Sequence, residues 1–434
     1  MAEASEGMLA GVAFISDTVI NAAARDPNKL QALLNDVIAN VEGNDVEGIG
    51  TVKNDFLKTM RLDGENTDKV YTDLLVGMSA MKAVRNYLKT DAYDRITASS
   101  PTKVFLTGTR WPTEVQKFKI NAFGMADYNS SDVIFRYGTD HYVGISLKKK
   151  PKTTAADPTI INKAFDTLMQ GATFNDAKKE LLEHRQEFFA DVIREAKEDG
   201  PLKLVGKIDG VDNWKTATNK QLWDAKVPRR KNNKTQYEFL INIKDVSAIS
   251  DDPSLVNSDS KAHNAMRDYV NEKLQSVGNT LNPLYQGFLN IMDEHADLFA
   301  ESLINLVLKS RLQDTLEDLV QNKFEFVLVT GIGECKKGNI SMGSGDAIGL
   351  DSVQCVLAAL AKQKAHIKLD TDSTFKKDAA KVFFDVYKGD FKLLSIELRY
   401  KGDFHSQPQF FATISSELKH LLKGQFSNIR NIIN

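Results

Sequence analysis

The spacing of apolar residues changes near residue 100, and this change limits the possible folds more than any other feature. From Gly11 to Thr90, apolar residues recur every three or four positions, which is the period of an amphipathic helix. Asp26-Pro27 and Asn66-Thr67-Asp68 are typical helix starts. Between residues 101 and 150, the runs KVFLTG, VQKFKINAF, DVIFRYG and YVGISLKK are short, rich in Val, Ile and Phe, and separated by turn residues. This pattern predicts a small sheet after a helical region.

The rest of the chain returns first to a helical pattern and then to strands. We expect a long helical region over about 158–322, beginning with TIINKAFDTLMQ and interrupted near 201–247 by strands in KLVGKID and YEFLINIKDV. Strand patterns such as FEFVLVTGIGE fill the last third before a closing helix, SSELKHLLKG. The chain is therefore expected to have an α+β or α/β fold. The predicted regions are a helical domain at 1–98, a sheet core at 99–175, a mostly helical region at 176–322 and a strand-rich region at 323–434.

Composition excludes several classes of protein. Two cysteines, Cys335 and Cys355, and seven histidines in 434 residues are too few for a disulfide scaffold or a zinc ribbon. A formal net charge of −2 excludes a histone-like blanket of positive charge but permits a local basic groove. No apolar run reaches the roughly 18 residues of a membrane span, and the N-terminus opens with acids rather than lysines. We expect a cytoplasmic protein with no membrane partner. The oligomeric state stays open, and a homo-oligomer is compatible with the pattern.

The most informative segment is NSSDVIFRYGTDHYVGISLKKKPKT, residues 129–153. Asp132 begins a strand pattern, a Gly-Thr-Asp turn follows, and the second strand carries Ser146, Lys148 and Lys150 on one face because strand side chains alternate. Lys149 points to the other face. Such a hairpin brings Asp132 close to Ser146 and Lys148. A carboxylate that holds a hard divalent cation, beside a lysine that orients water or offsets developing charge, suits metal-assisted hydrolysis of phosphodiesters.

A plainer interpretation competes with this one. An acid at one end of a hairpin and three lysines at the other are common at solvated sheet edges, where lysines deter aggregation. Three features favour a site: the apolar YVGIS before the lysines, the Asn-Ser-Ser lead-in to Asp132, and the predicted helix TIINKAFDTL, which would pack behind the sheet.

These residues resemble the core motif of the PD-(D/E)XK nuclease superfamily, which includes restriction endonucleases and phage and repair nucleases. The family pattern is an Asp at a strand start, a hairpin, and then an acid, any residue and a lysine. Asp132 matches the first acid and Lys148 the lysine, whereas Ser146 stands in place of the second acid. The motif is short and degenerate, and the matching segment is a small part of the chain. The serine is a weaker metal ligand than a carboxylate.

The resemblance implies a restriction-endonuclease-like mixed sheet and a metal-dependent DNA endonuclease, with a phage as one source. Asp132 would hold Mg²⁺ or Mn²⁺, Lys148 would position the attacking water, and Ser146 would line the second ligand position. Glu114, the nearest acid upstream of VQKFKINAF, ranks first as the group that completes the site. DNA would be the partner. The alternative is a non-catalytic nucleic-acid-binding or virion assembly protein with an inert nuclease-like core.

Further basic residues are candidates for nucleic-acid contacts. Lys149 and Lys150 would touch flanking phosphates. The densest basic cluster is KVPRRKNNKTQY, which follows two tryptophans and indicates either a nucleic-acid-facing loop or a solvated one. Its candidates are Arg229, Arg230, Lys231 and Lys234.

Two other segments have a weaker pattern. Asp385, Glu397 and Arg399 repeat the acid-and-base arrangement on a second hairpin, which is interpreted first as a charged sheet face and second as a phosphate-binding surface through Arg399. The glycine-rich TGIGECKKGNISMGSGDAIG lacks the spacing of a phosphate-binding loop and is predicted to be a flexible loop.

Overall fold

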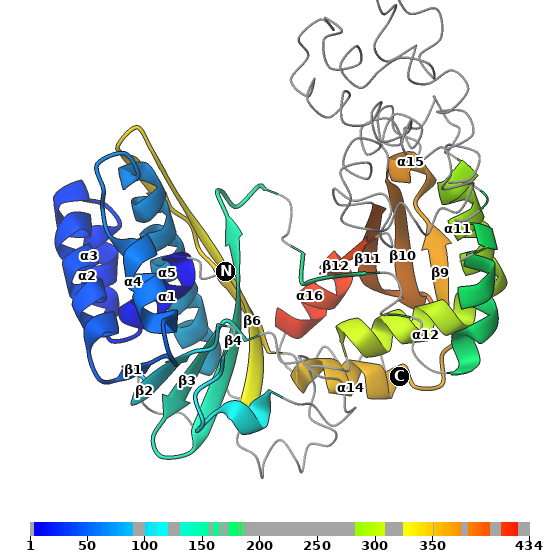
Figure 1. Ribbon diagram of the computed structural model, residues 1–434, viewed down its shortest axis with the longest axis horizontal. Helices are drawn as coiled ribbons and strands as arrows, with labels where there is room; N and C mark the ends of the chain where they lie inside the picture. Colours follow the sequence, from blue (N-terminus) through cyan, green and yellow to red (C-terminus); the bar gives the residue numbers. More distant parts are fainter. Residues whose placement is uncertain are drawn as a thin grey trace, which may run out of the picture. The chain divides into compact units, whose positions relative to one another are not determined.

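The computed structural model shows a mixed α/β protein (Figure 1). By compactness the chain divides into two units, one made of residues 1–160, 304–363 and 413–434 and the other of residues 161–303 and 364–412. The predicted boundaries near 98, 175 and 322 do not coincide with this division. The residues described are 4–89, 100–108, 110–119, 131–155, 159–164, 168, 172–181, 183–184, 187, 283–308, 324–349, 351–374, 381–399 and 409–423.

Five helices form the N-terminal part of the first unit, as the apolar period predicts. Asp26 caps one of them by accepting the N–H of Asn28 at 3.0 Å, with Pro27 in the first turn. Another begins at Thr67, as expected. Their apolar faces form one core with the first sheet. The helices are α1 (Ala4–Val12), α2 (Asp17–Ala23), α3 (Pro27–Glu42), α4 (Val52–Met60) and α5 (Thr67–Leu88).

The first unit contains a seven-stranded mixed sheet in the order β1-β2-β3-β4-β6-β7, with β8 also paired to β6. Strands β2, β3 and β4 form an antiparallel meander, and β6 pairs with β4 in parallel. Strand β4 is therefore an interior strand of the sheet, not a solvated edge. The strands are β1 (Val46–Glu47), β2 (Lys103–Leu106), β3 (Val133–Tyr137), β4 (His141–Lys150), β6 (Phe324–Lys336), β7 (Asn339–Met342) and β8 (Asp346–Gly349).

The glycine-rich segment is not a loop, which corrects the sequence prediction. It forms the end of β6, then β7 and β8, all antiparallel. A Cβ at Gly331 would overlap the backbone of Val76, and one at Gly333 would lie 2.6 Å from the Cβ of Leu75. These glycines let helix α5 approach β6 closely, so they serve packing rather than conformational freedom.

The two faces of this sheet differ in chemistry. Val143, Ile145 and Leu147 of β4 and Val327 and Val329 of β6 belong to the core shared with the helices. Because strand side chains alternate, the intervening residues of β4 point to the opposite face. That face carries Gly144, Ser146, Lys148 and Lys150. We call it the site face.

The second unit contains a five-stranded sheet in the order β5-β12-β11-β10-β9. Lys388 of β10 forms a 2.9 Å ion pair with Glu301 of helix α12. Residues 323–434, which were predicted to be one strand-rich region, are thus divided between the two sheets, because β6, β7 and β8 belong to the first sheet. The elements are β5 (Ile161–Ala164), β9 (Ala365–Leu369), β10 (Val382–Lys388), β11 (Phe391–Arg399), α11 (Pro283–Glu294), α15 (Thr371–Thr374), and the greater part of β12 (Gln409–Ile414) and α12 (Ala296–Val307). Helices α14 (Asp351–Ala359) and α16 (Ser416–Lys423) belong to the first unit.

Two local predictions in this part of the chain were wrong. TIINKAFDTLMQ was expected to be a helix, but Ile161–Ala164 is strand β5, paired antiparallel with β12. The ladder to a strand about 250 residues farther along the chain overrides the local period. VQKFKINAF was expected to be a strand, but Gln116–Phe118 forms a short 3-10 helix. KLVGKID and YEFLINIKDV lie outside the described residues. Among the helices described, none is long and apolar enough to span a membrane.

Candidate functional site

The hairpin β3–β4 places Asp132, the residue before β3, beside β4. Val133 pairs with Ile145, and Asp132 follows next to the segment Ile145–Leu147. The N–H of Asp132 donates to the carbonyl of Ile145 at 2.7 Å, and its Oδ2 accepts the N–H of Leu147, also at 2.7 Å. Asp132 thus contacts β4 on both sides of Ser146, through its backbone at Ile145 and through its carboxylate at Leu147, in a half-buried position.

Ser146 is fully buried, at 0% exposure, and its Oγ has no hydrogen-bond partner among the described residues. A buried hydroxyl without a partner costs free energy, so it needs an explanation such as a ligand or a bound ion. Lys148 lies two residues farther on the same face and is half-buried. The structure therefore groups Asp132, Ser146 and Lys148 on adjacent strands.

Gly144, Ser131 and Phe324 come from three segments that pack closely on the site face, next to Ser146. A Cβ at Gly144 would overlap the Oγ of Ser131 and lie 2.5 Å from the ring of Phe324. Phe324 stacks on Phe118 with a centroid distance of 4.5 Å, and Phe118 packs on Tyr142 at 4.9 Å. Gly144 therefore leaves the space on the site face that the Ser131 side chain and the Phe324 ring occupy.

The two following lysines lie on opposite faces, as alternation predicts. Lys150 is 8% exposed and on the site face. Lys149 points to the helices, where its Nζ forms a 2.9 Å ion pair with the buried Asp73 of α5. The charge of Lys149 therefore neutralises a core carboxylate, and its role as a nucleic-acid contact stays a prediction. The sequence offered no sign of Asp73, which comes from a distant helix.

Glu114 does not join the group at Asp132. Its carboxylate accepts a 2.6 Å hydrogen bond from Nη1 of Arg136 and a 3.0 Å bond from the hydroxyl of Tyr142, and it lies 3.5 Å from the Nζ of Lys103. Tyr142 precedes Ser146 by four strand residues, or about 13 Å. Glu114 therefore links strand ends at the far end of the sheet, which corrects its expected role.

The same contacts shift the acidity of Glu114. Burial alone raises the pKa of this carboxyl group, but the hydrogen bonds from Arg136 and Tyr142 and the charges of Arg136 and Lys103 outweigh it. The net pKa is lowered. Glu114 is thus a stabilised anion suited to holding strands together.

Asp346 is a site-face acid that the sequence did not reveal. Lys148 pairs with Thr330 of β6, and Thr330 pairs with Asp346 of β8. The three residues form one row across the sheet. Asp346 lies in the segment predicted to be a loop, and only its pairing with β6 places it beside the motif strand.

The second hairpin is a charged sheet face. Asp385 forms a 2.7 Å ion pair with Lys392, and Glu397 pairs with Lys381 at 3.1 Å. Arg399 lies 2.9 Å from Glu397 and stacks over the ring of Phe411. Each of these charged side chains therefore has a partner of opposite charge on the second sheet. Arg229, Arg230, Lys231 and Lys234 lie outside the described residues.

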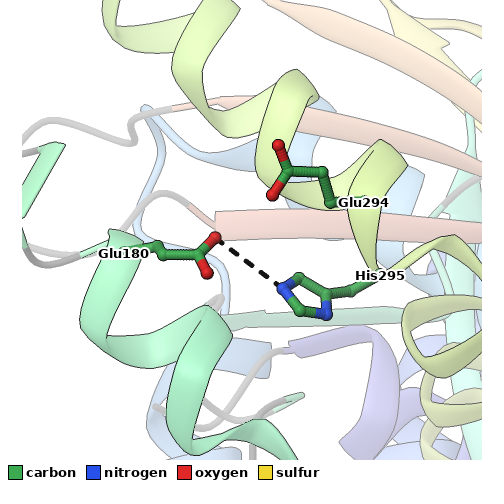
Figure 2. Close-up of side chains that lie close together, drawn as sticks. All are labelled: Glu180, Glu294 and His295. Atoms are coloured by element: carbon green, nitrogen blue, oxygen red, sulfur yellow. Dashed lines mark ion pairs between the residues drawn. The ribbon is translucent and has the colours of Figure 1, made fainter.

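A separate cluster of potential metal ligands lies in the second unit. Glu180, Glu294 and His295 each have a ligating atom within 4.8 Å of the others, and His295 Nε2 lies 3.7 Å from Glu180 Oε2 (Figure 2). Magnesium prefers oxygen ligands and its own waters, whereas an imidazole suits a transition metal. This cluster therefore gives no support to a Mg²⁺ site. No family model, curated protein or solved structure matches the chain.

Proposed function

We propose that this protein is a metal-dependent DNA endonuclease with a restriction-endonuclease-like sheet and its active site at Asp132, Ser146 and Lys148. One observation carries the proposal: the carboxylate of Asp132 accepts the N–H of Leu147, beside a buried hydroxyl of Ser146 that has no described partner and shares its face of β4 with Lys148. The mixed sheet, with β4 in its interior, agrees with this type of core.

The donors fit a hard divalent cation. Asp132 would supply a carboxylate and Ser146 an oxygen that lacks a described partner, which are the oxygen donors that a hard cation such as Mg²⁺ prefers. A bound Mg²⁺ would polarise the scissile phosphate and lower the pKa of a water. Because only one of the two donors is charged, we expect weak affinity for the metal and activity in the millimolar range of Mg²⁺.

Lys148 supplies the other half of the chemistry. It is the next site-face side chain after Ser146, so its ammonium can reach a phosphate oxygen or an attacking water held at Asp132. A positive charge there would stabilise the negative charge that develops on the oxygens of the pentacoordinate transition state. Asp132 keeps its carboxylate oriented through the bond from Leu147, which needs no rearrangement during the reaction.

The direct test is cleavage of supercoiled plasmid with Mg²⁺ or Mn²⁺ and without metal. We expect nicked or linear product with metal and none in EDTA. Asp132→Asn should abolish cleavage while the fold persists, because the amide oxygen still accepts the N–H of Leu147 but carries no charge. Asp140→Asn, in the turn of the same hairpin, is the matched control and should cut normally. Equal cleavage by the Asp132 variant and the wild type would refute the assignment.

A second function is favoured by Ser146 standing in place of an acid. With one carboxylate fewer, the same sheet would bind nucleic acid or support assembly without cleaving. DNA binding with no cleavage in Mg²⁺ or Mn²⁺ would select this function over the first.

A further inference from the structure

The second unit holds a cluster of metal-ligating side chains made up of Glu180, Glu294 and His295. We call it the Glu-Glu-His cluster. Glu180 lies in the helical segment 175–181, Glu294 ends helix α11, and His295 joins α11 to α12. In Figure 2 the carboxylates of the two glutamates and one nitrogen of the imidazole turn toward a common space. Three elements thus bring their ligating atoms together there.

Packing contacts on both sides of the Glu-Glu-His cluster hold these elements in place. The ring of Phe174, just before the segment 175–181, meets the ring of Phe299 in α12 edge-on, with a centroid distance of 5.6 Å. Beyond the other end of this segment, the ring of His184 lies against Gly287 of α11, where a Cβ would overlap it. The ligating side chains are therefore positioned by the packing of their helices, which lowers the entropy cost of binding an ion.

The charges of the Glu-Glu-His cluster call for a cation. The ligating oxygens of Glu180 and Glu294 lie within 4.8 Å of each other, so the two carboxylates repel. Among the described residues, no lysine or arginine lies within ion-pair distance of either carboxylate. The imidazole of His295 is the partner that they share, and its Nε2 lies 3.7 Å from Oε2 of Glu180. This distance is longer than the roughly 2.7–2.9 Å of a charge-assisted hydrogen bond.

The geometry at His295 fits an ion between the ligands. Its Nε2 is shielded from solvent and has no hydrogen-bond partner among the described residues, which requires an explanation. Two ligand atoms that each lie about 2.1 Å from a tetrahedral metal are about 3.4 Å apart. The 3.7 Å between Nε2 and Oε2 of Glu180 is close to this separation. The side chain of Glu180 is 41% exposed, so an ion can enter from solvent.

We propose that the Glu-Glu-His cluster binds one divalent transition-metal ion of the zinc type. An imidazole nitrogen with two carboxylates is a ligand set that Zn²⁺ accepts, whereas Mg²⁺ prefers oxygen ligands and its own waters. The ion links the segment 175–181 to the junction of α11 and α12, and so stabilises the second unit. This site is separate from the proposed nuclease site, since all three ligands belong to the second unit and Asp132 to the first.

The test is a titration of the untagged full-length chain with Zn²⁺ in competition with a chromogenic zinc chelator. We expect one tight equivalent in the wild type. Glu180→Gln, Glu294→Gln and His295→Gln should each weaken it at least ten-fold, because even changes next to metal ligands cost about 10–100-fold in affinity. Glu183→Gln is the matched control, because this exposed carboxylate lies one turn beyond Glu180 and pairs with Lys179. It should bind zinc as the wild type does.

Equal zinc affinity in the wild type and the three ligand variants would mean an adventitious ion only and would overturn the proposal. Displacement of the zinc by an equal concentration of Mg²⁺ would overturn the choice of metal. Asp132→Asn should bind zinc normally. A loss of the tight equivalent in Asp132→Asn, with full binding in Glu180→Gln, would place the ion in the first unit and refute the assignment.

Scanning calorimetry gives a second readout that does not depend on nuclease activity. Free Zn²⁺ at about 100 times its Kd should raise the Tm of the second unit by about 5–10 °C in the wild type and by less in Glu180→Gln. Glu180 is partly exposed, so its variant should keep the wild-type Tm in EDTA and carries the test even if His295→Gln does not fold. An equal rise in Tm for Glu180→Gln and the wild type would contradict the proposed link.

Discussion

Replacing Ser146 by alanine should stabilise the metal-free protein while weakening its metal-dependent activity. Ser146 Oγ is buried without a described hydrogen-bond partner. An unsatisfied buried polar group costs about 1–3 kcal/mol. Removing one oxygen leaves a small void, which costs a few tenths of a kcal/mol at about 24 cal/mol per Å³ of cavity. This cost reduces the gain. We therefore expect a net gain of about 1 kcal/mol.

Scanning calorimetry in EDTA measures this gain. For a cooperative unit of this size, 1 kcal/mol raises Tm by about 2–4 °C. In millimolar Mg²⁺, the wild type should gain stability from metal binding and the alanine variant should gain less, because a ligand that binds only the folded state stabilises it. Plasmid cleavage by the variant should fall moderately, since a weak ligand is lost.

Ser79→Ala is the matched control with the opposite outcome. Ser79 is also buried in the first unit, but its Oγ donates to the carbonyl of Gly343 at 2.9 Å and accepts the N–H of Ile332 at 3.0 Å. Its loss leaves two backbone groups unpaired, which costs about 1–3 kcal/mol. If Ser146→Ala lowers Tm as Ser79→Ala does, the hydroxyl of Ser146 has a partner in the folded protein and the reasoning is wrong.

Three other predictions concern the same sheet. Lys148→Ala should lower the single-turnover cleavage rate at saturating DNA by about 10²–10³-fold, while Lys152→Ala leaves this rate unchanged. If both variants instead lose DNA affinity equally, in a salt-dependent way and with no change in the saturated rate, both lysines only contact phosphates. Gly144→Ala should destabilise the first unit by about 1–3 kcal/mol, as measured by urea unfolding, since its Cβ overlaps two neighbours. The pKa of Glu114 is lowered in the folded state, so this carboxylate stabilises the fold above about pH 4.3. That stabilisation is lost as the pH falls through the lower pKa of the folded state. The stability difference between wild type and Glu114→Gln should therefore shrink in acid, and a constant difference from pH 7 to pH 2 would contradict the ion-pair role.

The local parts of this fold follow from the sequence alone. The N-terminal helices, with their starts at Asp26-Pro27 and Thr67, and the hairpin of β3 and β4 were predicted because both depend on short-range periodicity and turn chemistry. The placement of Ser146 and Lys148 on one face follows from strand alternation.

Long-range pairing decided the rest. Strand β5 has a sequence compatible with a helix, and its partner β12 lies far along the chain. Glu114 was ranked by its position in sequence, yet Arg136 and Tyr142 hold it at the other end of the sheet. Asp346 entered the site face only through the pairing of β8 with β6. Such contacts join residues with no local relation, so no window of sequence encodes them, and the tertiary structure alone determines which charges share a surface.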